Sequence, residues 1–265
     1  MSRAVKMALK LLAGASLLGL PAVLMGVPAS AGHSWGGYHW ARPANSFILN
    51  LYKNTNLDWN PSNRTGYVEQ AATDWSISTV LDANINGVGV NDPRKCSPTT
   101  GKVQVCSYNY GYRGWLGVAQ IWLSGLHITQ GTVKLNDSYF SLSTYNTPEW
   151  RALVACQEIG HTFGLDHQDV DQTNPNLGTC MDYTNNPLGP PSNEHPNQHD
   201  YDELAIIYNH IDTTTTVSTT VMAVGQPADD WGQAVRFTKG GKGRIFVKNL
   251  GGNQKVVTFV FWATE

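Results

Sequence analysis

Several residues that bind metals or move protons lie close together in the stretch "CQEIGHTFGLDH". On a helix, Gln157 and His161 are four residues apart, so their side chains leave the same side and lie about 5–6 Å apart, close enough to share one ion. Glu158 is next to Gln157, where its carboxylate can accept a proton from a metal-bound water. Gly164 lets the chain leave the helix at positive φ, and His167 can then fold back as a further ligand, because neutral imidazole is a good zinc donor. The spacing predicts a zinc site suited to hydrolysis.

The helix that must carry this site has clear start and stop signals. Thr147 can serve as its N-cap, Pro148 suits the first helical position, and Glu149 favours the positive end of the helix. Gly164 supplies the stop. Two further segments with apolar residues at helical spacing, 66–78 and 196–211, are also predicted to be helices.

The remaining regular structure is predicted to be β. Alternating or β-rich runs predict strands at 45–54, 79–90, 102–111, 115–123 and 127–137. We interpret segment 127–137, which alternates around Gly131, as an edge strand. Two β-rich runs over 243–262 flank Leu250-Gly251-Gly252-Asn253, a strong hairpin signal, and a bare hairpin is marginal in water, so it is expected to pack on the main domain. Helices and strands together predict an α+β fold.

The first 31 residues are expected to be a signal peptide. A basic start is followed by a long apolar run and by Ala29-Ser30-Ala31, an order typical of a secretory signal cleaved after Ala31. A membrane anchor is the alternative, but the glycines and prolines in the run and the small residues at its end favour cleavage. The expected organisation is a signal peptide at 1–31, a main domain at 32–212, a Thr-rich linker at 213–225 and a C-terminal β-hairpin extension at 226–265. The protein is expected to be secreted and extracellular.

The cysteine count predicts disulfides. The chain has 4 cysteines, and an even number in an exported protein indicates two bridges with three possible connectivities. Proximity and placement favour Cys96 with Cys106 and Cys156 with Cys180. A Cys-ligated metal is the weaker alternative because no C-x-x-C pair exists.

The charge balance excludes several partners. The chain carries 18 Lys and Arg against 20 Asp and Glu, and without basic runs this gives no electrostatic case for nucleic acid. No segment after residue 31 is apolar for long enough to cross a bilayer, so no membrane contact is expected after signal cleavage.

The motif resembles the zinc signature of the metzincin metallopeptidases, H-E-x-x-H-x-x-G-x-x-H followed by a Met-turn. The match runs from Glu158 through His161 and Gly164 to His167. Met181 in "GTCMDY" is the Met-turn candidate, and in this family such a methionine underlies the metal site.

The resemblance covers roughly residues 45–211 and implies a fold, a cofactor and an activity. The implied fold is a metzincin-like mixed twisted sheet with an active-site helix, a Met-turn and a C-terminal helix, and the C-terminal hairpin lies outside it. Tyr183 occupies the place where astacin-like and serralysin-like members carry a tyrosine that binds the metal or stabilises the oxyanion. The implied protein is a bacterial secreted zinc endopeptidase of matrixin or astacin type, a monomer with Zn²⁺ as cofactor and a protein or peptide as substrate.

The sequence departs from the family at Gln157, where the first ligand would be histidine. An amide oxygen can coordinate zinc, but zinc prefers imidazole, thiolate or carboxylate, so weaker metal binding is expected. Three interpretations remain open. Gln157, His161 and His167 hold the metal, or another residue such as His195 or His199 replaces Gln157. In the third, the site is empty or catalytically inactive, and the protein is an inactive secreted binding protein with a weak or empty metal site.

Glu158 favours the hydrolytic interpretation, because an inactive scaffold has no physical need for a carboxylate at the water position. In that interpretation Glu158 is the general base and Tyr183 donates to the oxyanion. The predicted edge strand at 127–137 would pair with an extended peptide substrate by strand addition.

Overall fold

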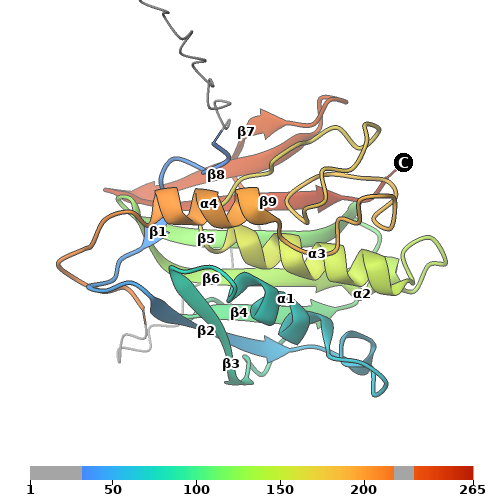
Figure 1. The fold of residues 1–265 in the computed structure, drawn as a ribbon, viewed down its shortest axis with the longest axis horizontal. Helices are drawn as coiled ribbons and strands as arrows, with labels where there is room; N and C mark the ends of the chain where they lie inside the picture. Colours follow the sequence, from blue (N-terminus) through green and yellow to red (C-terminus); the bar gives the residue numbers. More distant parts are fainter. Residues whose placement is uncertain (1–31, 218–229, 265) are drawn as a thin grey trace, which may run out of the picture. The chain divides into compact units, whose positions relative to one another are not determined.

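The computed structural model describes residues 32–217 and 230–264, which belong to one compact unit, Gly32–Glu265. The expected signal peptide at 1–31 and residues 218–225 of the expected linker lie outside the described residues. Within them the fold is mixed α+β, with one large mixed sheet and few helices (Figure 1). The expected α+β class is therefore confirmed.

The sheet has the order β3-β2-β4-β6-β5-β9-β8-β7, and β1 pairs with β6 beside this path. The pairs among β1, β2, β3, β4 and β6 are parallel, whereas β5, β7, β8 and β9 join by antiparallel pairs. The strands are β1 (His39–Trp40), β2 (Phe47–Asn54), β3 (Leu81–Val88), β4 (Val103–Tyr108), β5 (Trp115–Ser124), β6 (His127–Asn136), β7 (Gln233–Phe237), β8 (Gly243–Gly251) and β9 (Gln254–Trp262).

The expected edge strand is wrong. Strand β6 lies inside the sheet, between β4 and β5, and residues Gly131 to Asn136 are buried. Two polar residues of its buried half do not face open solvent: Thr132 is buried, and Lys134 lies over the ring of Tyr110 on the second face of the sheet. Strand β5 is the outermost strand before the C-terminal hairpin, and β9 pairs with it from Trp115 to Ser124.

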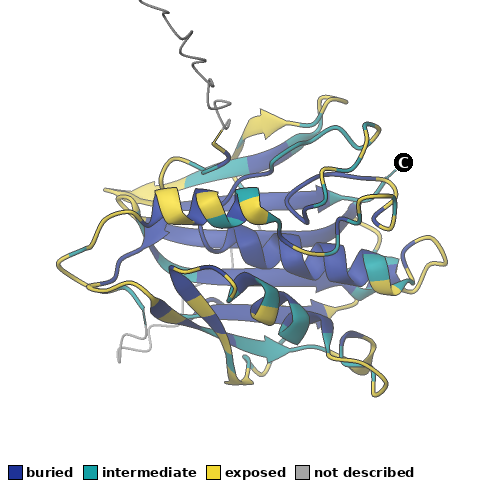
Figure 2. Cartoon of the chain, viewed as in Figure 1, coloured by how far each residue is buried: buried dark blue, intermediate teal, exposed yellow. Residues whose placement is uncertain are grey.

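The helices gather on one face of this sheet (Figure 1). They are η1 (Leu57–Trp59), α1 (Tyr67–Trp75), α2 (Asp137–Phe140), α3 (Pro148–His161) and α4 (Gln198–Ile207). Figure 2 shows α3 as the buried central helix and α4 as the outer one, with an exposed side. Every residue from Trp150 to His161 in α3 is buried, as expected of a helix enclosed by its neighbours.

Two disulfides hold the chain, and they are the expected pairs, Cys96–Cys106 and Cys156–Cys180. The second bridge ties α3 to the segment before Met181. Both bridges are compatible with an extracellular protein. No helix in the described part of the chain is both long and apolar enough to span a bilayer.

Candidate metal centre

Helix α3 and the turn after it place the motif. The Thr147 side chain accepts a hydrogen bond from the Trp150 amide and caps the helix start, with Pro148 in the first turn. Gly164 has φ +102°, and a Cβ there would lie 2.0 Å from the carbonyl oxygen of Tyr38. Only glycine fits this turn, which returns the chain so that His167 comes back beside His161.

The two motif histidines meet directly. Their Nε2 atoms are 3.0 Å apart, and both residues are buried. The Nδ1 atom of His161 is 2.9 Å from the Leu165 carbonyl oxygen, and since a carbonyl only accepts, Nδ1 carries the proton. Nε2 of neutral His161 therefore presents its lone pair to His167, and burial lowers the pKa of His161 well below its usual value, which keeps it neutral.

Asp166 and Arg244 control the tautomer of His167. Nδ1 of His167 is 3.1 Å from the Asp166 carboxylate and 2.8 Å from Nη1 of Arg244, which also donates to Asp166 at 2.7 Å. If Nδ1 accepts from Arg244, Nε2–H of His167 donates to His161, and the pair is satisfied without an ion. If Nδ1–H donates to Asp166, both Nε2 lone pairs face each other and require a cation between them.

These contacts also shift the acidities of the group. Burial lowers the pKa of His167 to about 4, with Arg244 adding to the effect and Asp166 opposing it. Burial alone would raise the pKa of Asp166, but hydrogen bonds and charge from His167 and Arg244 outweigh it and lower that pKa. Asp166 is thus a permanent anion behind a neutral imidazole, an arrangement that supports metal-ligating histidines.

Glu158 is fully enclosed between α3 and the sheet. A Cβ on Gly117 of β5 would lie 2.7 Å from the Glu158 carboxylate, so only glycine leaves room for this side chain. Neither carboxylate oxygen has a hydrogen-bond partner, and burial raises the pKa of Glu158 well above its usual value. Nearby backbone amides of Ala119 and Phe261 offset this only in part. The enclosed site therefore favours the protonated, neutral form of Glu158.

The orientation of Gln157 leaves an acceptor free. Its side-chain Nε2 donates to the Cys180 carbonyl oxygen at 2.7 Å. Because a carbonyl only accepts, this contact distinguishes Nε2 from Oε1 in the amide. The opposite end, Oε1, is buried without a partner. Met181 lies under the same helix, since a Cβ on Gly160 would be 2.8 Å from its sulfur.

The C-terminal hairpin covers this group. The ring of Phe259 stacks on His161, with centroids 4.2 Å apart and planes at 9°. Tyr183 packs against His167 and Phe261, and its hydroxyl donates to the carbonyl oxygen of Val260 at 2.7 Å. Strand β9 therefore lies over the motif residues, and none of them reaches solvent.

The other sequence candidates lie elsewhere. His195 is half exposed and binds Asp74 at 2.7 Å, and His199 stacks on His33. Two groups of histidine and aspartate side chains in the described residues could hold a metal ion: His33, His199 and Asp200 form one, and His39, His210 and Asp212 form the other. Among the described residues, His161 and His167 form no group with a third His, Cys, Asp or Glu whose donor atoms all lie within 4.8 Å of one another. The third protein donor there would therefore be the Gln157 amide.

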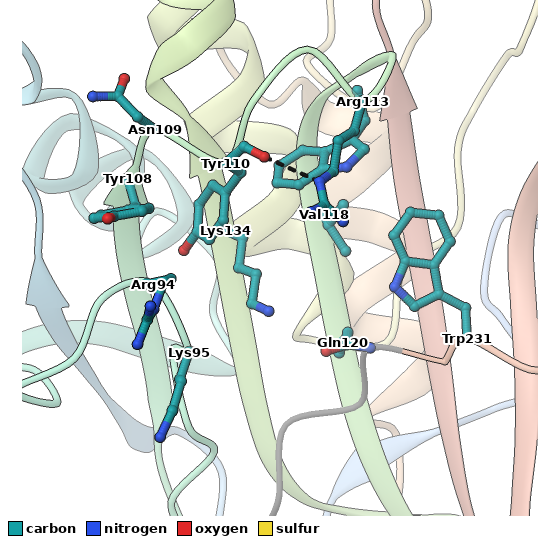
Figure 3. A pocket seen from close by; sticks show the side chains of 11 residues that line it. Arg94, Lys95, Tyr108, Asn109, Tyr110, Arg113, Val118, Gln120, Lys134 and Trp231 are labelled. Carbon is teal, nitrogen blue, oxygen red and sulfur yellow. Dashed lines mark hydrogen bonds between the residues drawn. The ribbon is translucent and has the colours of Figure 1, made fainter.

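A pocket of about 500 Å³ opens on the sheet face away from α3 (Figure 3). Val118 and Gln120 form part of its wall and point to the opposite side of β5 from Ala119, because successive strand residues alternate. Four cationic side chains and several aromatic rings surround it, among them Arg94, Lys134, Tyr110 and Trp231. The motif residues do not line this pocket.

No family model matches the chain, and no curated protein shows significant sequence similarity to it.

Sequence reasoning missed the residues that surround the motif. Asp166 lies inside the quoted stretch, and its position before His167 was the one available signal. Arg244 and Phe259 come from the C-terminal hairpin, and no local pattern connects them to the motif.

Proposed function

We propose that the protein is a secreted zinc-dependent endopeptidase of metzincin type. In the state described here, its own C-terminal strand β9 covers the proposed site. The main support is the set of buried polar atoms around α3. The two histidine Nε2 atoms converge at 3.0 Å, and Gln157 Oε1 and both Glu158 oxygens are buried without hydrogen-bond partners. Such orphaned groups are costly and rare in a folded protein, and an ion or a catalytic role accounts for them.

The donor set fits zinc, with one weak position. His161 and His167 supply two imidazoles, and Gln157 would supply an amide oxygen. When bound, zinc lowers the pKa of a coordinated water and polarises the scissile carbonyl. The order of elements, with a strand and helix first, the motif helix later and Met181 before the last helix, agrees with the resemblance to metzincins.

The protein groups have distinct tasks in hydrolysis. Glu158 would take a proton from the attacking water and deliver it to the leaving amine. Tyr183 would turn its hydroxyl from Val260 to the oxyanion of the tetrahedral intermediate. Asp166 and Arg244 would hold His167 in its orientation.

An extended peptide would pair with β5 in the place that β9 takes here. Strand addition at a sheet edge is a common way to bind peptides, and β5 is paired on that side only by β9. If the C-terminal hairpin left this position, the Tyr183 hydroxyl would be released from Val260 and the ring of Phe259 would no longer cover His161. Water could then reach Glu158.

A closed binding protein on the same scaffold is the second candidate. The observation that favours it is the burial of β9, whose residues Val256 to Phe261 are all buried, so that opening exposes a large apolar surface.

Cleavage of a peptide library by the full-length secreted protein, mapped by mass spectrometry, separates the two candidates. We expect zinc-dependent cleavage that Glu158→Gln abolishes and that Glu149→Gln, on the first turn of the same helix, leaves intact. Low urea, which favours local opening before global unfolding, should raise the rate. No cleavage at any urea concentration, or equal cleavage by Glu158→Gln, would reject the peptidase.

A further inference from the structure

A second group of metal donors lies outside the α3 motif. His39 and His127 are register partners in the parallel pair of β1 and β6, so they are neighbours across the two strands. His210 and Asp212 follow the end of α4. The donor atoms of His39, His210 and Asp212 lie within 4.8 Å of one another. Three distant segments of the chain therefore bring imidazoles to one carboxylate.

The histidines converge on a single oxygen. Nε2 of His127, His39 and His210 lies 3.2, 3.5 and 3.7 Å from Oδ1 of Asp212. The Nε2 atoms of His39 and His210 are 3.0 Å apart. Tetrahedral zinc with bonds of about 2.0–2.1 Å separates its ligand atoms by roughly 3.3 Å, and the donor atoms of His39, His210 and Asp212 lie 3.0, 3.5 and 3.7 Å from one another. His127 contacts Asp212 but is not one of the donors that all lie within 4.8 Å of one another.

Outer contacts fix the two buried donors. Nδ1 of His39 is 2.8 Å from the Gly37 carbonyl oxygen, which only accepts, so Nδ1 carries the proton and Nε2 presents its lone pair inward. The other carboxylate oxygen of Asp212, Oδ2, accepts from the Arg42 guanidinium at 3.0 Å and the Arg42 amide at 3.1 Å. Oδ1 is left facing the histidines.

One side of this group is buried and the other side is open to solvent. The side chains of His39 and Asp212 are 4% and 11% exposed, whereas those of His127 and His210 are 37% and 42% exposed, so an ion can enter from solvent. Arg42 balances the single negative charge of Asp212. Imidazole-rich sets with one carboxylate suit zinc and its transition-metal neighbours rather than calcium or magnesium, which prefer oxygen ligands.

We propose that His39, His210 and Asp212 bind a zinc ion that fastens β1 to the segment leaving α4, with His127 of β6 beside it on the Asp212 carboxylate. Three protein ligands leave the fourth zinc position to solvent. Without an ion the same residues form a hydrogen-bonded cluster in which one Nε2–H bridges His39 and His210. This site is independent of the α3 motif and of the proposed peptidase activity.

Carbethoxylation of the wild-type protein by diethylpyrocarbonate tests the site without any substitution. The chelator-stripped full-length protein is treated with or without zinc chloride, and modified histidines are located by peptide mass spectrometry. We expect zinc to abolish modification of His210, whose Nε2 it would occupy, and to leave His195 modified. His195 is the internal control because it is a more exposed histidine that also pairs with one aspartate. Equal modification of His210 with and without zinc would overturn the site, and so would equal protection of His210 and His195.

Stoichiometry tests the same assignment. His210→Ala and Asp212→Asn should each lose one zinc equivalent per chain relative to wild type, whatever the α3 motif holds, and His195→Ala should lose none. Near-UV circular dichroism checks that each variant is folded. Wild-type zinc content in both folded variants would contradict the proposal.

Discussion

Glu158→Gln is expected to stabilise the metal-free protein relative to wild type as the pH rises above about 4.5. Glutamine has nearly the same shape but no ionisable proton, so the substitution removes the cost of a charge in the enclosed space beside Gly117. Burial raises the folded-state pKa of Glu158 well above 4.5, its ordinary value. The carboxyl group is therefore neutral in the folded chain and ionised in the unfolded chain over the intervening pH range.

The sign and size of the effect follow from proton linkage. A raised folded-state pKa contributes stability that is fully present below about pH 4.5 and is lost as the pH rises toward the folded-state pKa. Within that window the folded state binds one more proton than the unfolded state. The free energy of unfolding of wild type should then fall, relative to Glu158→Gln, by about 1.4 kcal/mol for each pH unit. The two proteins should converge at acidic pH.

Urea unfolding at a series of pH values, with chelator present and both disulfides intact, measures this difference. All other titrating groups are common to the two proteins, so the difference between their profiles isolates Glu158. Glu149→Gln, on a partly exposed part of the same helix, controls for the loss of one negative charge. If the free energies of unfolding of wild type and Glu158→Gln changed with pH in parallel, the inference that Glu158 is enclosed and neutral in the folded protein would be refuted.

Three further substitutions test neighbouring parts of the site. Gly164→Ala should destabilise the fold by about 1–3 kcal/mol in urea unfolding, because its φ is +102° and its Cβ would meet the Tyr38 carbonyl; an unchanged midpoint would contradict this turn. Phe259→Ala should cost about 3–5 kcal/mol in the same measurement, since its ring is fully buried against His161, and a loss below about 1 kcal/mol would mean that β9 is not packed there. Gln157→His should tighten zinc binding in a chelator competition assay; unchanged affinity would exclude Gln157 as a ligand.

Local sequence signals predicted the elements that carry the site. Thr147, Pro148 and Gly164 bounded the motif helix because capping, proline placement and positive φ are properties of single residues and their nearest neighbours. The hairpin at 243–262 was predicted for the same reason. Cys156 and Cys180 could be paired because they lie close in sequence and flank the motif.

Long-range pairing was not available from the sequence. Arg244 reaches Asp166 across 78 residues, and no local pattern records which strand the hairpin will join. Alternation around Gly131 predicts a strand at 127–137, but it does not show whether that strand lies at an edge or inside the sheet. Lys134 lies over the ring of Tyr110 on the second face of the sheet. Periodicity identified the strand but not what covers it.

The position of β9 links the chemistry of the site to the stability of the fold. Glu158 can act as a general base only when ionised, and while β9 covers it, burial opposes its charge more than the nearby backbone amides of Ala119 and Phe261 favour it. Tyr183 cannot donate to a substrate while its hydroxyl is bound to Val260 of the same strand. A peptide on β5 would need the ladder that β9 now fills. Hydrolysis and the closed hairpin are therefore mutually exclusive, so any peptidase activity must scale with the fraction of molecules in which β9 has left β5.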